Sequence, residues 1–375
     1  MCFDRHGERL LQLLCYVGYC VEFPSKLAKR IGGHPEWSRH TMYRAINEEY
    51  VTVWRHDNGN GRHLVRSLRL TEKGLAYVGD RSPEMLSLIQ YKQEMVPQYV
   101  HYAPERVRRY HAYAIGTVMA HNAGAVFLPW EKPALLSAEC ENHPFRIDDT
   151  KPYYYGNEEV RAAVQELFPD EMIKGSRLVG IIVQGPDCYC LYHTGGVRMY
   201  WMRTTEENYV SMILVLLAER KFRVNVIRQV VIGNSMKIAG RVCKTPSKDK
   251  GTRYYVLSNY FNNCYFLPNT ELGDRQLKIM LDETATMRVN EEFMKECVAP
   301  DYSTKFYDAL CREDGRPAIL NGDFDMLRLS GADTVGEDLG KAPVFFCFDH
   351  QLEIMQMLVG PQVEVRSLGR IEEYG

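Results

Sequence analysis

The chain has no long uninterrupted hydrophobic run. Its longest apolar candidate, Tyr209–Leu217, is far shorter than the roughly 18 residues that mark a membrane-spanning helix. Residues 1–9 are charged and the amphipathic run after them is broken by Gly18, so we expect no signal peptide. These absences predict a soluble, cytoplasmic protein that has no membrane partner and keeps its 11 cysteines reduced.

Clustered metal ligands are also lacking. Cys188 and Cys190 form the only close cysteine pair, and no second Cys/His pair lies near them at zinc spacing. No His–apolar–His triplet is present, and His111 and His121 are ten residues apart on an expected helix. The sequence therefore predicts no metal site and no cofactor.

No catalytic constellation could be identified. Asp187 lies at an expected hairpin tip, where a metal-dependent nuclease can place an acid, but the strand after it carries neither Glu nor Lys. The segment 321–325 (NGDFD) lacks the glycine that should follow it, and the distal glutamate, of a calcium loop. The sequence therefore assigns no catalytic residue and favours a role other than catalysis.

Charge is distributed unevenly along a chain whose net charge is only −2. Residues 1–110 hold 17 Lys and Arg against 12 Asp and Glu, and residues 111–375 hold 29 against 36. The basic excess in residues 1–110 favours a polyanionic partner there.

A length of 375 residues allows two or three domains, and 45% hydrophobic residues indicate that these domains are globular.

Three helical patterns open the chain. Residues 8–20 have apolar residues at helical spacing, Pro24 can open a second helix over 25–31, and a third is expected over 35–49. Gly32–Gly33 supplies a tight turn before the third helix. Its packed face is expected to contain Trp37, Met42, Tyr43 and Ile46, with the residues between them facing outward.

A β-hairpin pattern follows these helices. Residues 50–54 alternate like a strand, residues 64–70 return as its partner, and Asn-Gly pairs at 58–59 and 60–61 favour a tight tip. Thr71 is the expected N-cap of the next helix. The positively charged side chains expected around the hairpin are Arg55, Arg62, Arg66 and Arg69.

This order of elements predicts a winged helix-turn-helix over residues 1–80, a module that usually binds DNA. The third helix would enter the major groove, and the hairpin would contact backbone phosphates. Contacts to double-stranded DNA are expected from Ser38, Arg39, His40, Thr41, Arg44, Arg55, Asn60, Arg62, His63 and Arg66.

Two resemblances to known families extend this interpretation. The run LRLTEKGLAYV at 68–78 resembles the ends of winged helices in many bacterial regulators and mobile-element proteins. The segments RRYHAYAIGTVMAHNAGAVF (108–127), SRLVGIIVQGPDCYCLYHTGG (176–196) and MYWMRTTEENY (199–209) together resemble the replication-relaxation proteins of Gram-positive plasmids and conjugative elements. That resemblance implies a second, α/β domain that is loosely similar to restriction-type nucleases.

The remainder predicts a helical linker at 81–124 and a mixed α/β (α+β) domain at 125–375. The linker should contain helices at 82–96 and 104–122, with arginines and tyrosines that either extend the DNA-facing surface or brace the domains. Residues 153–155 are expected to form a half-buried aromatic strand. Further strands are expected at 126–128, 178–183, 188–192, 197–202, 226–232, 253–257, 264–267, 344–348 and 363–367, and helices at 157–168, 206–220, 272–282 and 350–358.

We therefore expect a DNA-binding protein of a plasmid or integrative element that acts in replication, transfer or their regulation. Residues 125–375 would bind a protein partner or self-associate. Two alternatives stay open: a nuclease or relaxase with a dispersed site, and a winged helix that binds protein instead of DNA.

Overall fold

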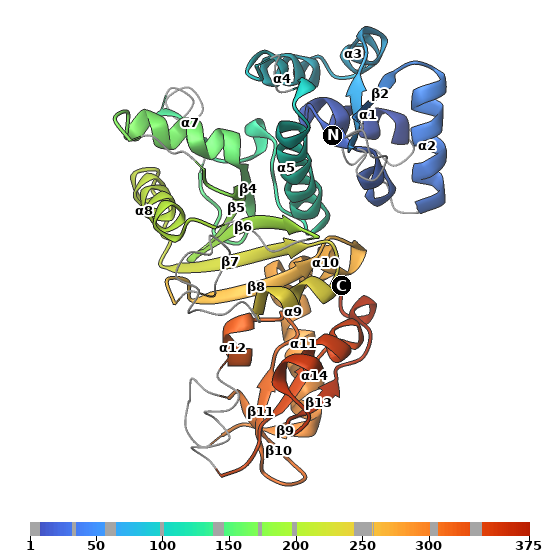
Figure 1. Cartoon of the computed structure of the whole chain (residues 1–375). Helices are drawn as coiled ribbons and strands as arrows, with labels where there is room; N and C mark the ends of the chain where they lie inside the picture. The colour runs from blue at the N-terminus through green and yellow to red at the C-terminus, as the bar shows by residue number, and fades with distance from the viewer. Residues whose placement is uncertain are drawn as a thin grey trace. The chain divides into compact units, whose positions relative to one another are not determined.

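The computed structural model describes residues 8–31, 35–56, 65–97, 101–137, 146–171, 175–196, 201–243, 257, 259–300, 307–330 and 340–375. The chain is a mixed α/β protein with three β-sheets in these residues (Figure 1). It divides into two compact units, Met1–Val118 and Met119–Gly375, and the boundary falls inside helix α5, Pro104–Asn122.

The N-terminal unit combines helices with a small antiparallel sheet. In chain order it contains α1 (Arg9–Tyr19), β1 (Phe23–Pro24), the 3-10 helix η1 (Ser25–Arg30), α2 (Pro35–Asn47), β2 (Val51–His56), β3 (Val65–Leu70), α3 (Glu72–Gly79) and α4 (Pro83–Glu94). The strand order is β1-β3-β2.

Helix α1 is the centre of this unit, because all but two of its residues are buried. Gly18 lets its neighbours approach closely: a Cβ there would lie 2.5 Å from Ile89 Cδ1 of α4 and 2.7 Å from Leu70 Cδ1 of β3. Helix α4, which we expected in a linker, thus packs on α1, and it also contacts α3. The hydroxyl of Thr71 accepts a hydrogen bond from Gly74 N at 3.1 Å, which confirms the predicted N-cap of α3.

The C-terminal unit contains a five-stranded sheet in the order β4-β5-β6-β7-β8. Strand β5 pairs antiparallel with β4 and with β6, whereas β7 pairs parallel with β6 and with β8. Their bounds are β4 Tyr153–Gly156, β5 Leu178–Gln184, β6 Asp187–Gly195, β7 Val226–Gly233 and β8 Asn263–Pro268. The helices between and after these strands are α7 (Asn157–Leu167), α8 (Arg203–Glu219), α9 (Lys237–Cys243), α10 (Glu271–Leu281) and α11 (Glu283–Glu296).

A second five-stranded sheet has the order β13-β12-β11-β10-β9. Strands β9, β10 and β11 pair antiparallel, and β11, β12 and β13 pair parallel. The strands are β9 Cys297–Val298, β10 Ala309–Cys311, β11 Pro317–Leu320, β12 Val344–Cys347 and β13 Glu364–Ser367, with helices α12 (Met326–Ser330) and α14 (Leu352–Val359) between them.

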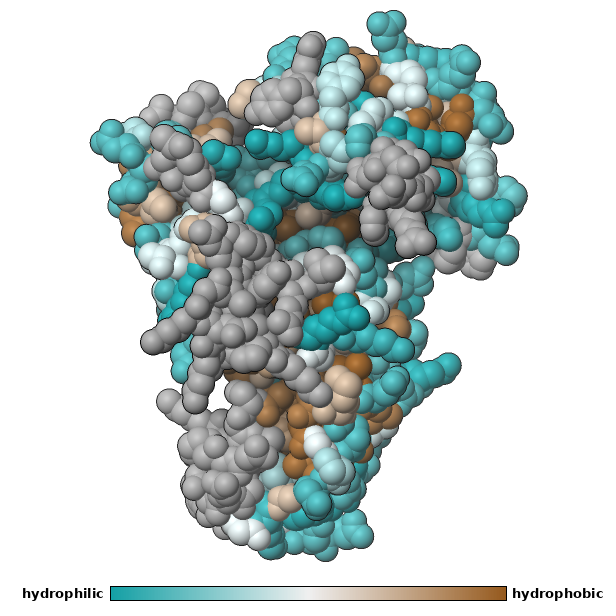
Figure 2. All heavy atoms as spheres, viewed as in Figure 1, coloured by the Kyte–Doolittle hydropathy of each residue, from teal (hydrophilic) through white to brown (hydrophobic). Residues whose placement is uncertain are grey.

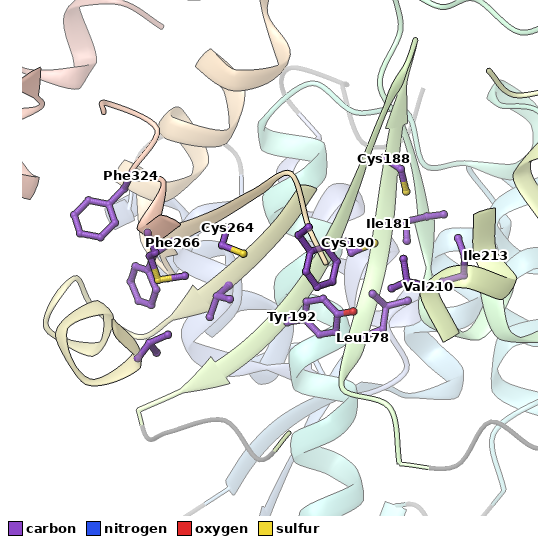
Figure 3. Close-up of a cluster of buried hydrophobic side chains, with 14 of the residues drawn as sticks. Leu178, Ile181, Cys188, Cys190, Tyr192, Val210, Ile213, Cys264, Phe266 and Phe324 are labelled. Carbon is purple, nitrogen blue, oxygen red and sulfur yellow. The ribbon is translucent and has the colours of Figure 1, made fainter. Parts of the chain in front are cut away.

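One hydrophobic core joins the two sheets of this unit. It unites buried residues of β5, β6 and α8, such as Leu178, Cys190 and Val210 (Figure 3), with Phe345 and Met355 from the second sheet and α14. A separate cluster on α11, β9 and β12 contains Phe293, Cys297 and Phe346. Continuous runs of buried residues in β5, β8 and β12 explain why the sequence predicts these strands.

Several expectations need correction. The second helix of the N-terminal unit is a 3-10 helix, and Val126 makes only an isolated bridge with Tyr153 instead of starting a strand. The strand expected at 197–202 lies outside the described residues at 197–200, and its last two residues are not in a strand. The strand expected at 253–257 also lies almost wholly outside them. Strand β4 is more buried than expected, and α9, α11 and β9–β11 were not predicted.

Candidate nucleic-acid interface

Helix α2 turns a different face inward from the one that the apolar pattern predicts. Ser38 is 5% exposed, its hydroxyl donates a hydrogen bond to the carbonyl of Ile31, and Ala45 is fully buried. Trp37 and Tyr43, which we expected in the packed face, are instead 54% and 48% exposed. The prediction for Ser38 was therefore wrong, because small residues seven apart allow closer packing than the aromatic rings do.

The outward face of α2 keeps most of the predicted basic residues. Arg39, His40 and Arg44 are exposed, whereas Thr41 is half-buried and donates its hydroxyl to Trp37 O at 2.9 Å. Glu36, His40, Tyr43 and Asn47 follow one another at helical spacing along the middle of this face, and all are exposed. The sequence did not predict that Tyr43 and Asn47 lie on this outward face. The spacing of Ser38 and Ala45 was the signal that could have revealed the true inner face.

Cationic side chains on and near α2 contact neighbouring aromatic and acidic groups. The guanidinium of Arg9 lies 3.9 Å from the ring centroid of Trp37, and that of Arg39 lies 5.7 Å from Tyr43. Arg44 Nε lies 2.8 Å from Glu48 Oε1, and this hydrogen bond raises the pKa of Arg44. Such an exposed ion pair contributes little stability, so a phosphate can replace the carboxylate at small cost.

Two arginines face each other across the β2–β3 hairpin. Arg55 is directly opposite Arg66, and both side chains are exposed. Because side chains alternate along a strand, they lie on the same face as Val51, Val53 and Leu68, further toward the tip. Neither strand contains an acidic residue, and like charges directly opposite destabilise a sheet. The predicted contacts Asn60, Arg62 and His63 lie outside the described residues.

Arg69 is not part of this exposed basic surface, contrary to our expectation. Its Nη2 lies 2.7 Å from Glu22 Oε1, and Glu22 is completely buried. Arg69 also donates to His101 O at 2.6 Å and stacks over Trp54 at 4.7 Å. The arginine therefore fixes the base of the hairpin to the segments before β1 and before α5.

His101 completes this buried cluster. Its Nδ1 lies 2.6 Å from the same carboxylate oxygen of Glu22. At the next inward position of β3, Ser67 Oγ lies 3.2 Å from His111 Nε2 of α5. Hydrogen bonds of Arg69 and Ser67 thus hold the base of the hairpin, and Arg55 and Arg66 lie nearer to its tip.

In the C-terminal unit, one aspartate of each acidic segment weighed in the sequence, Asp187 and Asp325, is bound by the chain's own groups. Asp187 Oδ1 accepts from Arg228 Nε at 2.8 Å. Asp325 accepts from the backbone nitrogens of Cys264 and Leu327 and from Asn263 Nδ2, at 2.8–3.1 Å. Within the described ranges, no three His, Cys, Asp or Glu side chains come together in a way that could hold a metal ion.

Comparisons with known proteins add no relative: no family model, no curated protein and no solved structure matches the chain. No helix among the described residues combines the length and the apolar character needed to cross a membrane. Among the residues that Figure 2 colours by hydropathy, hydrophilic ones predominate on the face shown.

Proposed function

We propose that the N-terminal unit is a winged helix-turn-helix that binds double-stranded DNA. Two features support this proposal: α2 precedes the β2–β3 hairpin, and the short strand β1 pairs with β3, as expected for that module. In this proposal α2 lies in the major groove and the hairpin contacts the backbone.

The pairing of Arg55 with Arg66 carries the proposal. Two exposed cations opposite each other reduce the stability of the free hairpin, whereas an anion bound between them removes the repulsion. A DNA phosphate is such an anion, and it would contact both side chains. Exposed Arg39, His40 and Arg44 on α2 supply further donors for phosphates or base edges.

The narrower form of the proposal is a role in the replication, transfer or regulation of a mobile element. It is supported by the resemblance of 108–127, 176–196 and 199–209 to replication-relaxation proteins. In this form the C-terminal unit supplies a partner-binding or self-association surface.

Selection from a pool of random DNA duplexes, at two salt concentrations, tests the proposal. We expect one sequence to be enriched, with affinity falling steeply as salt increases. Enrichment of a palindrome or direct repeat would indicate two copies per site. No binding at either salt concentration would contradict DNA recognition and favour a winged helix that binds protein.

A further inference from the structure

Two cysteines face each other at the edge of the second sheet of the C-terminal unit. Cys297 in β9 is directly opposite Cys311 in β10. Strand β9 has two residues and is the edge strand of its sheet. Both cysteines are reduced and belong to the hydrophobic cluster formed with α11.

The register puts this pair at the closest type of position in an antiparallel ladder. Arg312 N donates to Glu296 O at 3.0 Å, so residues 312 and 296 form a hydrogen-bonded pair. Cys311 N donates to Arg316 O on its other side. Residues 311 and 297 are therefore a non-hydrogen-bonded pair, in which Cα atoms are about 4.5 Å apart and side chains approach most closely. Disulfides join Cα atoms separated by about 4.4–6.8 Å.

We propose that Cys297 and Cys311 are a redox pair that forms a cross-strand disulfide by exchange with a small disulfide such as oxidised glutathione. One cysteine thiolate attacks a sulfur of oxidised glutathione, which forms a mixed disulfide and releases one glutathione thiolate. The second cysteine thiolate then attacks the protein sulfur of the mixed disulfide and displaces the second glutathione. The two cysteines are oxidised, one glutathione disulfide is reduced, and the two thiol protons end on two glutathione molecules.

Burial makes this reaction slow. Burial raises the pKa of Cys297 to about 12, and it also raises the pKa of Cys311, so few thiolates form at neutral pH. Opening of the short edge strand β9 exposes both thiols without unfolding the sheet. The rate should therefore increase with pH and remain below that of an exposed thiol pair.

Cys188 and Cys190 give an internal comparison. They are two residues apart on β6, so their Cβ atoms are about 6.6 Å apart, whereas a disulfide requires about 3.5–4.5 Å. Their thiols are buried in the core between the sheets. This pair should stay reduced when Cys297 and Cys311 become linked.

The disulfide would link the end of helix α11 covalently to strand β10. That helix ends at Glu296, immediately before Cys297, so the bond would fasten its carboxyl end to β10. The bond would also restrict the unfolded chain between residues 297 and 311. Oxidation should therefore raise the Tm of the folded protein.

The test incubates the full chain in glutathione buffers of increasing oxidised-to-reduced ratio, blocks free thiols under denaturing conditions, and identifies linked peptides by mass spectrometry. We expect a peptide joining Cys297 to Cys311, whose fraction follows the ratio and returns to zero with dithiothreitol. Cys188 and Cys190 should remain blocked as free thiols. The Cys297→Ser and Cys311→Ser variants should lose the linked peptide and the increase in Tm.

The wild-type measurement does not depend on how well either variant folds. The proposal is contradicted if both cysteines are fully blocked as thiols at the most oxidising ratio. It is also contradicted if they link only in denatured chain, or if Cys297 pairs mainly with a different cysteine.

Discussion

Individual buried polar residues are mostly satisfied by close partners. Glu206 is fully buried and accepts hydrogen bonds from Ser176 Oγ and Arg177 N at 2.8 and 2.6 Å. Lys132 is 2% exposed and donates to Glu159 Oε2 and Tyr154 O. Asp323 is different, since its buried Oδ1 has no hydrogen-bond partner in the part of the chain that the structure describes. A charge at that position is therefore expected to be unfavourable.

The pH dependence of stability should reveal Asp323. Burial and, secondarily, repulsion by Asp325 raise the pKa of Asp323 to about 7, against 3.8 ordinarily. Between pH 3.8 and pH 7 the carboxyl of Asp323 is protonated in the folded state and ionised in the unfolded state. The free energy of unfolding of the wild type therefore decreases as pH rises from about 4 to about 7. Asp323→Asn should therefore be more stable than wild type at pH 8, by a few kcal/mol, with the difference vanishing near pH 4.

Chemical denaturation of both proteins across this pH range measures the effect. His193, whose pKa burial lowers to about 4, destabilises both proteins equally as pH falls below about 6.5. The difference between the two proteins removes that contribution. A constant difference from pH 4 to pH 8 would contradict the raised pKa of Asp323.

Ser38 and Arg39 are neighbours with different expected roles. Ser38→Ala removes a buried hydrogen bond to Ile31 O and should lower stability by about 1 kcal/mol without changing base preference. Arg39→Ala should leave stability nearly unchanged and, if the side chain contacts a base, lower discrimination by about 1–3 kcal/mol. Thermal unfolding and competition between selected and altered duplexes measure the two effects. A loss of selectivity in Ser38→Ala with unchanged stability would contradict the observed orientation of α2.

At the scale of elements, the sequence predicts where a helix or strand lies better than it predicts which of its faces is buried. The bounds of α5 agree with the prediction, and the β2–β3 hairpin is confirmed, because proline, asparagine–glycine and alternation are local signals. The face of α2 was predicted wrongly, since Trp37 and Tyr43 are apolar but large, and the neighbouring segment accommodates Ser38 and Ala45. Likewise nothing local distinguishes Arg69, with its buried partner Glu22, from Arg66.

The cap of α3 gives a test at this scale. Thr71 Oγ1 accepts from Gly74 N and donates to the carbonyl of Glu49 at 2.6 Å, so it joins α3 to the end of α2. Thr71→Ala should lower stability by about 1–2 kcal/mol, whereas Thr71→Ser should retain most of it. Denaturant unfolding of the three proteins gives these values. Equal losses in the two variants would show that the methyl group of Thr71, and not its hydroxyl, is the stabilising part.

At the scale of the whole molecule, the sequence predicts a mixed α/β protein and the structure confirms that class. Strands rich in apolar residues, such as β5 and β7, were predicted at nearly their true bounds. The division of the C-terminal unit into two sheets was not predicted, because strand order depends on pairing between distant segments. The short strands β9–β11 carry too few residues to show a period.

The salt dependence of DNA binding by Arg55→Ala/Arg66→Ala tests the central claim most directly. A control, Arg161→Ala/Arg288→Ala, removes the same charge from exposed positions of the C-terminal unit. If Arg55 and Arg66 contact phosphates, the slope of log affinity against log salt should become shallower by about 2 in the first variant alone. Its stability should be unchanged or increased by up to about 1 kcal/mol, because a like-charge pair is removed. Equal slopes in wild type and both variants would contradict a DNA-binding hairpin.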